Sequence, residues 1–366
     1  MMSPSASDLV VDIVINNHNY GAFLEDAIES ACGQTHERVN VLAVDDGSTD
    51  DSRRILARYG ERIGLILQEN GGQAAALNAG MERCKGDVVI FLDADDVLRP
   101  EAAASAAAAF AADEGLSKVQ FRMETIDARG RPTGELKPAA HLPMPNGDLR
   151  EAELACPYDL VWMATSANAF RSEALRRILP IPVDEYPVTG ADWYLVHLTA
   201  LLGRVASLDA VGAGYRVHGA NSYELEQGRL DLDHLRQAIG FAASTSRELL
   251  RLAGELELAP PERILSIADL ANRMASLKLE PARHPIASDR PLGLLADAVG
   301  AARRRAGVSL AMKAIFIAWF AAMAAAPRGL ARRLAELFMF PERRRSLNGV
   351  LGRLQRSGAT TAAVVA

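Results

Sequence analysis

Residues 88–96 read VVIFLDADD, five large apolar residues followed by carboxylates at positions 93, 95 and 96. The apolar run predicts a strand buried on both faces, and the carboxylates mark its carboxyl end. Two unpaired carboxylates one residue apart are costly to bury, whereas hard Mg²⁺ or Mn²⁺ takes oxygen ligands of this kind. The stretch therefore fits either a divalent-cation site or a solvated acidic turn with a helix cap.

Short apolar strands alternate with helical segments through the first 112 residues. Strands are predicted over 9–15, 39–44, 63–68 and 88–92, and helices over 22–33, 48–59, 73–84 and 101–112. Strands separated by helices of this length form right-handed βαβ units. We therefore expect an α/β fold with a mostly parallel sheet and helices on both faces, in which ligands bind at the carboxyl ends of the strands.

Polar clusters follow each of these predicted strands. They are Asn16-Asn17-His18-Asn19, Asp45-Asp46-Gly47-Ser48, Asn70-Gly71-Gly72 and Asp93-Ala94-Asp95-Asp96. Asp45 and Asp46 are candidates for hydrogen bonds to a nucleobase or ribose, while Asp50 and Asp51 fit helix capping better. The Asn70-Gly71-Gly72 segment opens a helix of small residues, where we expect free backbone N–H groups to meet a phosphate.

The strand pattern continues to about residue 222 and then stops. Further elements are predicted as a strand over 118–126, a loop over 130–147, helices over 166–179 and 190–202, and a strand over 211–218. Amphipathic helical segments follow over 230–258, 262–279 and 291–306. We expect one α/β domain over residues 1–224 and a helical region over 225–366.

The composition is that of a globular chain in a reducing compartment. The chain has 366 residues, a length typical of about two domains, and it is 49% apolar and 23% charged, which excludes disorder as a whole. Its three cysteines, at 32, 84 and 156, are too widely spaced for a disulfide framework or a CxxC metal site. Residues 1–8 lack the features of a signal peptide, so we expect a cytoplasmic location.

The charge of the chain is divided unevenly. Residues 301–366 contain twelve Lys and Arg and two Glu, a net charge of +10. Because the net charge of the whole chain is −6, the other 300 residues carry a net charge of −16. Residues 308–326 carry one charge in nineteen positions, marginal for a span that needs about 20 apolar residues. We expect a helix lying in the membrane interface with Trp319 and Phe320 at headgroup level, or alternatively a core helix. Residues 301–345 are then expected to meet an anionic membrane surface, peripherally and on the cytoplasmic face.

Taken in order, the strand-end motifs resemble the signatures of the family 2 glycosyltransferases of the GT-A fold. The segments that carry the resemblance are DDGSTD at 45–50, NGG at 70–72 with LNAG at 77–80, and FLDADD at 91–96, within roughly residues 9–222. The resemblance implies that Asp46 contacts the nucleobase, that Asp93 meets the ribose, and that Asp95 holds Mg²⁺ or Mn²⁺ against the donor diphosphate. The other residues expected on the donor side are Asn17, Asp45, Asn70 and Asn78.

Three later segments extend the resemblance. TGADWYL at 189–195 is similar to the family segment that carries the general base, here Asp192, with Ala191 where many members have Glu. The neighbouring Trp193 is expected to stack on an acceptor sugar or to lie in the core. YRVHGANS at 215–222 implies that His218 completes the metal or diphosphate site. SANAFR at 166–171 resembles an acceptor-side segment and implicates Asn168, with Ala167 in place of the usual glycine.

The resemblance implies metal-dependent transfer of a sugar from a nucleotide-diphosphate donor, with uridine as the expected base, and inversion at the anomeric carbon. The expected acceptor is a hydroxyl of a glycan, a lipid-linked molecule or another compound, and no nucleic-acid partner is expected. A nicotinamide-binding domain is excluded because no GxGxxG follows the first strand. An aspartyl-phosphate phosphatase fits poorly because three predicted strands precede Asp93. A non-catalytic binding or scaffold protein of the same fold stays open.

Overall fold

The computed structural model describes residues 5–219, 221, 230–305 and 308–340. Within these residues the chain forms two compact units. The first comprises 5–142, 146–149, 162–219 and 221, and the second comprises 143–145, 150–161, 230–305 and 308–340. The predicted domain boundary between residues 224 and 225 lies outside the described residues, as do Ala220 and Ser222 of the YRVHGANS segment.

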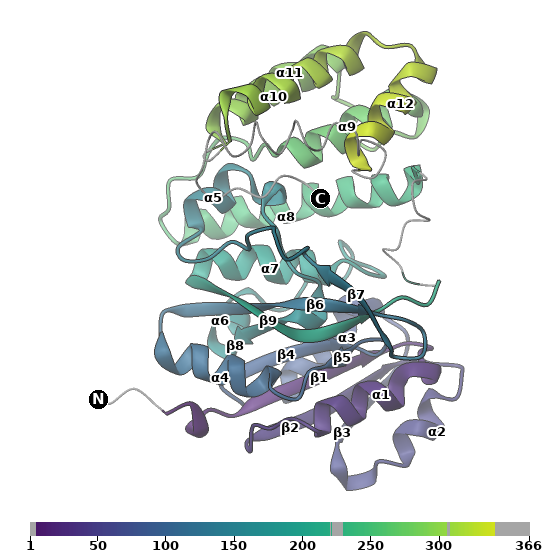
Figure 1. The fold of residues 1–366 in the computed structure, drawn as a ribbon, viewed down its shortest axis with the longest axis vertical. Coiled ribbons are helices and arrows are strands. Elements are labelled where there is room, and N and C mark those ends of the chain that lie inside the picture. The colour runs from purple at the N-terminus through teal and green to yellow at the C-terminus, as the bar shows by residue number, and fades with distance from the viewer. Residues whose placement is uncertain (1–4, 220, 222–229, 306–307, 341–366) are drawn as a thin grey trace. The chain divides into compact units, whose positions relative to one another are not determined.

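A mixed sheet forms the centre of the first unit (Figure 1). Its strands are β1 (Val11–Asn17), β2 (Val39–Asp46), β3 (Gly64–Gln68), β4 (Val88–Asp93), β5 (Val97–Leu98), β6 (Leu116–Ile126), β7 (Pro132–Lys137), β8 (Asn168–Arg171) and β9 (Arg204–Arg216). They lie in the order β3-β2-β1-β4-β8-β6-β9-β5, with β7 paired to β6. Strands β3, β2, β1 and β4 are mutually parallel, whereas β8 is antiparallel to both β4 and β6.

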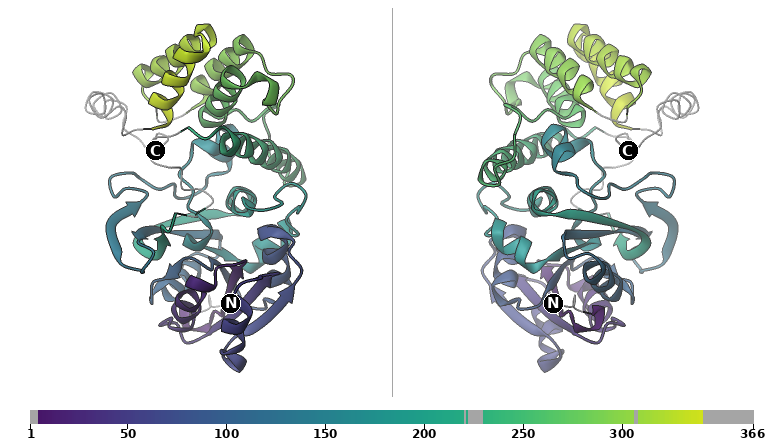
Figure 2. Two further views of the ribbon diagram at one scale, coloured as in Figure 1. Left: turned by 90° about the vertical axis from the view of Figure 1, so that its right-hand side faces the viewer. Right: turned by 90° about the vertical axis from the view of Figure 1, so that its left-hand side faces the viewer.

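Helices cover both faces of this sheet, as the two views in Figure 2 show. They are α1 (Gly21–Cys32), α2 (Ser52–Ala57), α3 (Gly72–Arg83), α4 (Ala102–Ala112), α6 (Ser172–Ile178) and α7 (Ala191–Leu202). Right-handed crossovers from β1 to β2 to β3 put α1 and α2 on one face, and the return from β3 to β4 puts α3 on the other. The expected α/β class with helices on both faces is confirmed.

The central strands are buried on both faces, as their apolar runs predict. Val11, Ile13 and Ile15 of β1 and all five apolar residues of β4 are fully buried. Because β1 and β4 are parallel neighbours, with Asn16 opposite Asp93, their polar carboxyl ends meet at one edge of the sheet. The buried strands thus deliver the strand-end motifs to one place.

Two segments differ from the elements predicted for them. The predicted loop over 130–147 contains β7, which pairs with β6 and begins at Pro132, a strand position where no N–H is needed. The predicted helix over 166–179 splits into β8 and α6. Residues 169–171 pair with β4 on one side and residues 168–170 pair with β6 on the other, and these distant partners outweigh the local helical preference.

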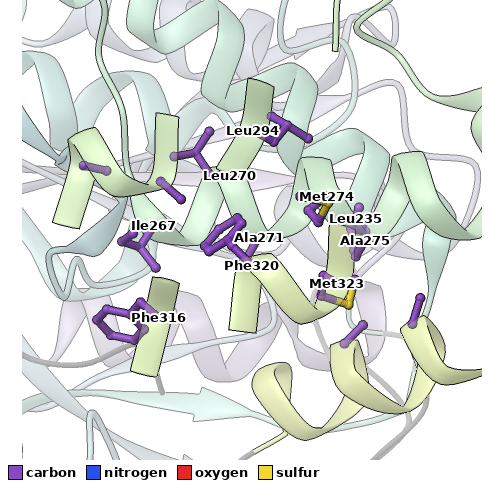
Figure 3. Packing of buried hydrophobic residues seen from close by; sticks show 14 of the residues in the cluster. Leu235, Ile267, Leu270, Ala271, Met274, Ala275, Leu294, Phe316, Phe320 and Met323 are labelled. Atoms are coloured by element: carbon purple, nitrogen blue, oxygen red, sulfur yellow. The ribbon is translucent and has the colours of Figure 1, made fainter. Parts of the chain in front are cut away.

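The second unit is helical. Its helices are α5 (Arg150–Ala155), α8 (Leu232–Glu255), α9 (Ile267–Leu279), α10 (Pro291–Arg304), α11 (Leu310–Ala325) and α12 (Arg328–Met339). The apolar faces of α8, α9, α10, α11 and α12 form a common core, of which Figure 3 shows residues from α8, α9, α10 and α11. The segment 308–326, for which an interfacial position was expected, supplies Phe316, Phe320 and Met323 to this core.

The position expected for Phe320 at headgroup level is wrong, because its ring is fully buried within the helical core. Trp319 is partly buried: its ring stacks on Phe338 at 4.4 Å between centroids, and its indole N–H donates to Leu334 O at 2.9 Å. Packing against neighbouring helices removes these rings from water as effectively as a lipid interface would. In the described part of the chain, no helix is both long and apolar enough to cross a membrane.

Candidate active site

Three carboxylates gather at the end of β4. Asp93 is the last residue of this strand, and its Oδ1 accepts hydrogen bonds from Asn16 Nδ2 at 2.8 Å and from Gln73 Nε2 at 3.1 Å. Burial, together with the charge of Asp95, raises the pKa of Asp93 to about 7. Burial also raises the pKa of Asp96, which accepts the Arg216 backbone N–H at 3.0 Å. This edge of the sheet is therefore strongly electronegative.

His218 lies beside this cluster, although it is 123 residues from Asp95 in the sequence. Its Nε2 is 3.0 Å from Asp95 Oδ2, and both side chains are largely buried. The ring packs on Phe23 at 4.7 Å between centroids, with the Tyr20 ring edge-on at 5.7 Å. Strand β9 delivers the histidine, and the structure thus brings together the two residues predicted to bind the metal.

Arg216, the last residue of β9, hydrogen-bonds to the backbone of Asp95 in this pair. Its fully buried guanidinium donates from Nε to Asp95 O at 2.7 Å and from Nη2 to Asp26 Oδ2 at 2.9 Å. The same group lies over the Phe23 ring, 5.0 Å from its centroid. The backbone of the Asp95 turn is therefore tied to both α1 and β9.

The residues present fit a divalent cation whose coordination is completed by oxygens of a bound ligand. Among the described residues, no group of three or more His, Cys, Asp or Glu side chains is arranged to hold an ion alone. Asp95 and His218 together offer one oxygen and one nitrogen donor, and Mg²⁺ at phosphate sites typically takes only one or two carboxylates besides substrate oxygens. Imidazole nitrogen and carboxylate oxygen are also both suitable ligands for Mn²⁺.

Asp192 occupies the first turn of α7, which begins after Gly190 in a left-handed conformation (φ 88°). Its Oδ1 accepts the Trp193 backbone N–H at 3.0 Å. Burial raises the pKa of Asp192, against the opposing effects of this N–H and of His197. The charge of Asp192 contributes in turn to the raised pKa of Asp93, so the predicted base and the predicted ribose ligand face a common environment.

The amides at the start of α3 are already used within the protein. Asp46 Oδ1 accepts from Gln68 Nε2 at 2.7 Å and from Gly71 N–H at 2.9 Å, and its Oδ2 accepts from Gly72 N–H at 2.8 Å. The Gln73 N–H donates to Val188 O at 3.2 Å. The expectation that free N–H groups here meet a phosphate is therefore wrong, because a buried carboxylate and a neighbouring carbonyl satisfy these donors first.

Three of the residues predicted to bind the donor, Asn17, Asp45 and Asp46, are buried at this edge of the sheet. Asp45 is fully buried and accepts from Asn17 Nδ2 at 3.0 Å and from Arg53 Nε at 2.9 Å. Exposed at this edge are His18 and Asn70, whose Nδ2 lies 2.9 Å and 3.0 Å from the two ring nitrogens of His18. His18 Nδ1 is in turn 2.7 Å from Asp46 O. Donor contact by Asn17, Asp45, Asp46 and Asn70 stays a prediction.

The remaining predicted residues make contacts within the fold. Asn78 Nδ2 donates to Ile181 O at 2.9 Å, and its Oδ1 accepts the Ile181 N–H at 2.8 Å. Asn168 is fully buried and donates to Met163 O at 3.0 Å and Ala164 O at 2.7 Å, which shapes the turn before β8. Half-buried Trp193 lies 5.9 Å from the His197 ring. Ligand contact by these three residues is likewise untested.

Comparison with known proteins identifies the domain that holds this cluster. Residues 12–179 match the family model for glycosyl transferase family 2. They form a family 2 glycosyltransferase domain. An uncharacterized glycosyltransferase of Nostoc sp. is 33% identical over 217 residues, which cover 58% of this chain and 66% of that protein. The predicted family membership is confirmed.

A second relative of the family 2 domain is the undecaprenyl-phosphate 4-deoxy-4-formamido-L-arabinose transferase of Pseudomonas syringae pv. syringae. It is 46% identical over 99 residues, which cover 25% of this chain and 29% of that protein. The chain therefore spans less than two thirds of the length of either relative. The crystal structure of S. aureus TarS shares the fold, with a TM-score of 0.51 and 16% identity over 90% of this chain and 55% of that one. The expected GT-A architecture is confirmed.

Sequence reasoning missed three residues around the family 2 site. Gln73 was passed over although it directly follows the Gly71-Gly72 turn, and it contacts Asp93. His18 belongs to a polar cluster that the sequence did place at a strand end, but nothing in the pattern indicates its contacts with Asp46 O and Asn70. Arg216 lies in the quoted YRVHGANS segment, and full burial of an arginine is not visible in a sequence.

Proposed function

We propose that the protein is an inverting glycosyltransferase that moves a sugar from a nucleotide-diphosphate donor, with UDP as the first candidate nucleotide, to an acceptor hydroxyl. The observation that carries the proposal is the pairing of Asp95 with His218 next to Asp93 at the carboxyl end of β4, with Asp192 near enough for its charge to raise the pKa of Asp93. The match of residues 12–179 to family 2 supports the same chemistry. A role in polysaccharide or glycan synthesis follows from this chemistry.

Each of these residues has a separate task in the proposed reaction. Asp95 and His218 would hold a divalent cation, which when bound would neutralise charge on the leaving diphosphate. Asp93 would accept a hydrogen bond from the donor ribose. Asp192 would take the proton from the acceptor hydroxyl as it attacks the anomeric carbon. Direct displacement by the acceptor oxygen, and therefore inversion, is proposed from the likeness to family 2.

The acceptor class is proposed from the relatives. The Pseudomonas relative is named as an undecaprenyl-phosphate transferase of an arabinose derivative, which supports a lipid-linked acceptor for this chain. A glycan hydroxyl is the other class that the proposed chemistry allows, since Asp192 needs only a proton donor of this kind. The half-buried Trp193, one residue from the base, is the first candidate to stack on an acceptor sugar.

A panel of nucleotide sugars tests the proposed activity. We expect release of nucleoside diphosphate from one donor class when Mg²⁺ or Mn²⁺ is present, and loss of that release with a chelator. Mass spectrometry of the acceptor product would check that the sugar is transferred. The anomeric configuration of the new bond, compared with that of the donor, would check inversion. A non-catalytic binding protein would bind a donor in calorimetry but release no diphosphate from any of them, and that result would replace the proposal.

We further propose that the basic end of the second unit binds an anionic phospholipid surface on the cytoplasmic side of a membrane. The exposed residues of α11 and α12 include Leu310 (84% exposed), Leu330 (49%), Leu337 (42%) and Ile315 (36%). Arg328, Arg332 and Arg333 of α12 are exposed as well. Apolar side chains interspersed with arginines match the headgroup and acyl boundary of such a surface. Residues 306, 307 and 341–345 of the predicted contact segment 301–345 lie outside the described residues.

Vesicle sedimentation tests this second proposal. We expect binding to vesicles that contain phosphatidylserine, weaker binding to neutral vesicles, and loss of the difference at about 1 M salt, where the Debye length falls to about 3 Å. Replacing Arg332 and Arg333 by Gln should weaken binding by about 1 kcal/mol per residue. Leu330→Ser should weaken binding as well, and Leu67→Ser on β3, an exposed leucine of the first unit (54%), is its matched control and should leave binding unchanged. Equal sedimentation with both vesicle types would contradict the proposal.

A further inference from the structure

The side chain of Gln73 joins three segments that are far apart in the sequence. Its Nε2 donates to Asp93 Oδ1 at 3.1 Å and lies 3.4 Å from Thr165 Oγ1. Its Oε1 accepts the backbone N–H of Ala191 at 3.2 Å. A primary amide has two donors and one acceptor oxygen, so this single group reaches the end of β4, the turn before β8 and the start of α7.

The backbone around Gln73 holds the same segments together. The Gln73 N–H donates to Val188 O at 3.2 Å, and a Cβ added to Gly72 would lie 1.8 Å from Pro187 O. Residues 187–188 therefore pack directly on the first turn of α3. That helix is itself seated closely on the sheet, because a Cβ added to Gly80 would lie 2.4 Å from Val14 Cγ1. Gln73 thus projects from a rigid support.

The segment that leads into α7 is irregular and partly exposed. Residues 179–190, which lead into it, form no helix or strand, and Val183 and Val188 are exposed. The N–H of Ala191, at the first position of α7, has no intrahelical partner by geometry, and Gln73 supplies one. Asp192 follows immediately, so any shift of this helix start moves its carboxylate relative to Asp93.

We propose that Gln73 is a positioning residue that keeps the start of α7, and with it Asp192, in register with Asp93. The inference rests on the proposed function, in which Asp93 meets the donor and Asp192 deprotonates the acceptor. Displacements of about 1 Å in such an arrangement lower rates by about 10²-fold, so one amide that spans both residues has a large effect on turnover. Gln73 acts through these two residues and takes no proton itself.

Gln73→Met tests the proposal because methionine has nearly the same length and volume but makes none of these hydrogen bonds. We expect kcat to fall by about tenfold or more while the donor KM changes by less than about threefold, the pattern of an interaction needed in the transition state. Hydrogen exchange at the Ala191 amide should become faster. Donor turnover is measured by diphosphate release, and exchange is measured on the full chain without donor.

Gln34→Met is the matched control. Gln34 is also a half-buried residue whose side-chain amide joins separate segments. Its Nε2 donates to Ser30 O at 2.9 Å and to Arg99 O at 3.0 Å, and its Oε1 accepts the Ala103 N–H at 2.9 Å. Ala103 lies in the first turn of α4, so exchange should become faster there. Because Gln34 contacts none of the site carboxylates, its kcat should stay at the wild-type level, which separates positioning from a general loss of stability.

Gln73→Glu separates the contact with Asp93 from the contact with Ala191. Glutamate keeps an oxygen for the Ala191 N–H but loses the donors to Asp93, so kcat should fall while exchange at Ala191 stays near that of the wild type. Wild-type kcat in Gln73→Met, or unchanged exchange at Ala191 in that variant, would overturn the proposal. If the wild-type chain itself turns over no donor, the proposed function fails, and the exchange measurement still decides whether Gln73 holds α7.

Discussion

Asp192→Asn is expected to lower the rate of sugar transfer by about 10²- to 10⁴-fold, the usual contribution of a general base. Asparagine keeps the size of the side chain and can still accept the Trp193 N–H through its oxygen, so the first turn of α7 should stay intact. Donor affinity should remain near the wild-type value, because in the proposed reaction Asp192 acts on the acceptor and does not contact the donor. Single-turnover transfer beside calorimetry of donor binding measures the two quantities separately.

The pH dependence of transfer gives a second check on Asp192. The carboxylate must be ionised to accept a proton, and burial raises its pKa. Activity should therefore be lost as pH falls through this raised pKa, at a higher pH than for an exposed aspartate, and should be retained above it. In Asp192→Asn the contribution of this carboxylate to the acidic limb of the single-turnover profile should disappear, which leaves the titration of Asp93, whose pKa is about 7.

Asp233→Asn is a control for the alternative that Asp192 only favours the start of a helix. Asp233 stands in the first turn of α8, as Asp192 does in α7. Removing either charge there costs about 0.3–1 kcal/mol of helix stability. Equal, small effects of the two substitutions on transfer would remove Asp192 from the mechanism.

Asp95→Ala is expected to abolish transfer and metal-dependent donor binding. Alanine removes the carboxylate that lies 3.0 Å from His218 Nε2, so one of the two side chains placed to hold the cation is lost. The measurement is a Mn²⁺ titration of both donor affinity and diphosphate release. Wild-type turnover by this variant in the presence of a chelator would require a metal-independent mechanism.

Two neighbouring substitutions should differ from Asp95→Ala in kind. His218→Ala should weaken metal and donor binding as well as rate, with the Phe23 ring losing a packing partner. Asp93→Ala should weaken donor binding more than it alters the preference between Mg²⁺ and Mn²⁺, because its Oδ1 is already engaged by Asn16 and Gln73. The same titration on the three variants distinguishes these roles.

The sequence predicts the elements whose signal is local. The apolar runs of β1, β2 and β4 and the polar residues that follow them indicate a parallel sheet and the edge where the site lies. These strands can be recognised without knowing which strands they pair with, because an apolar run by itself indicates burial on both faces. By contrast, residues 168–170 become a strand only because β4 and β6 are available on either side. No local pattern contains that information.

The candidate site was predictable in its charged residues and not in its hydrogen bonds. Asp93, Asp95, Asp192 and His218 follow motifs, and the structure places Asp95 beside His218. The use of Gly71 and Gly72 amides by Asp46, and the contact of Gln73 with Ala191 across 118 residues, depend on how loops meet after folding. An N–H group at a predicted helix start can be hydrogen-bonded by a carbonyl or carboxylate from a segment that is distant in the sequence, and the sequence does not show which one.

The pairing of Asp95 with His218 across 123 residues also bears on the order of folding. A growing chain that has emerged only as far as residue 179, the end of the matched family 2 segment, contains neither Asp192 nor His218. Contacts this distant in sequence form slowly and late. The parallel strands β1 to β4 can associate first, whereas the proposed cation site of Asp95 and His218 is completed only when β9 is inserted beside β6. Catalytic competence is thus coupled to completion of the fold.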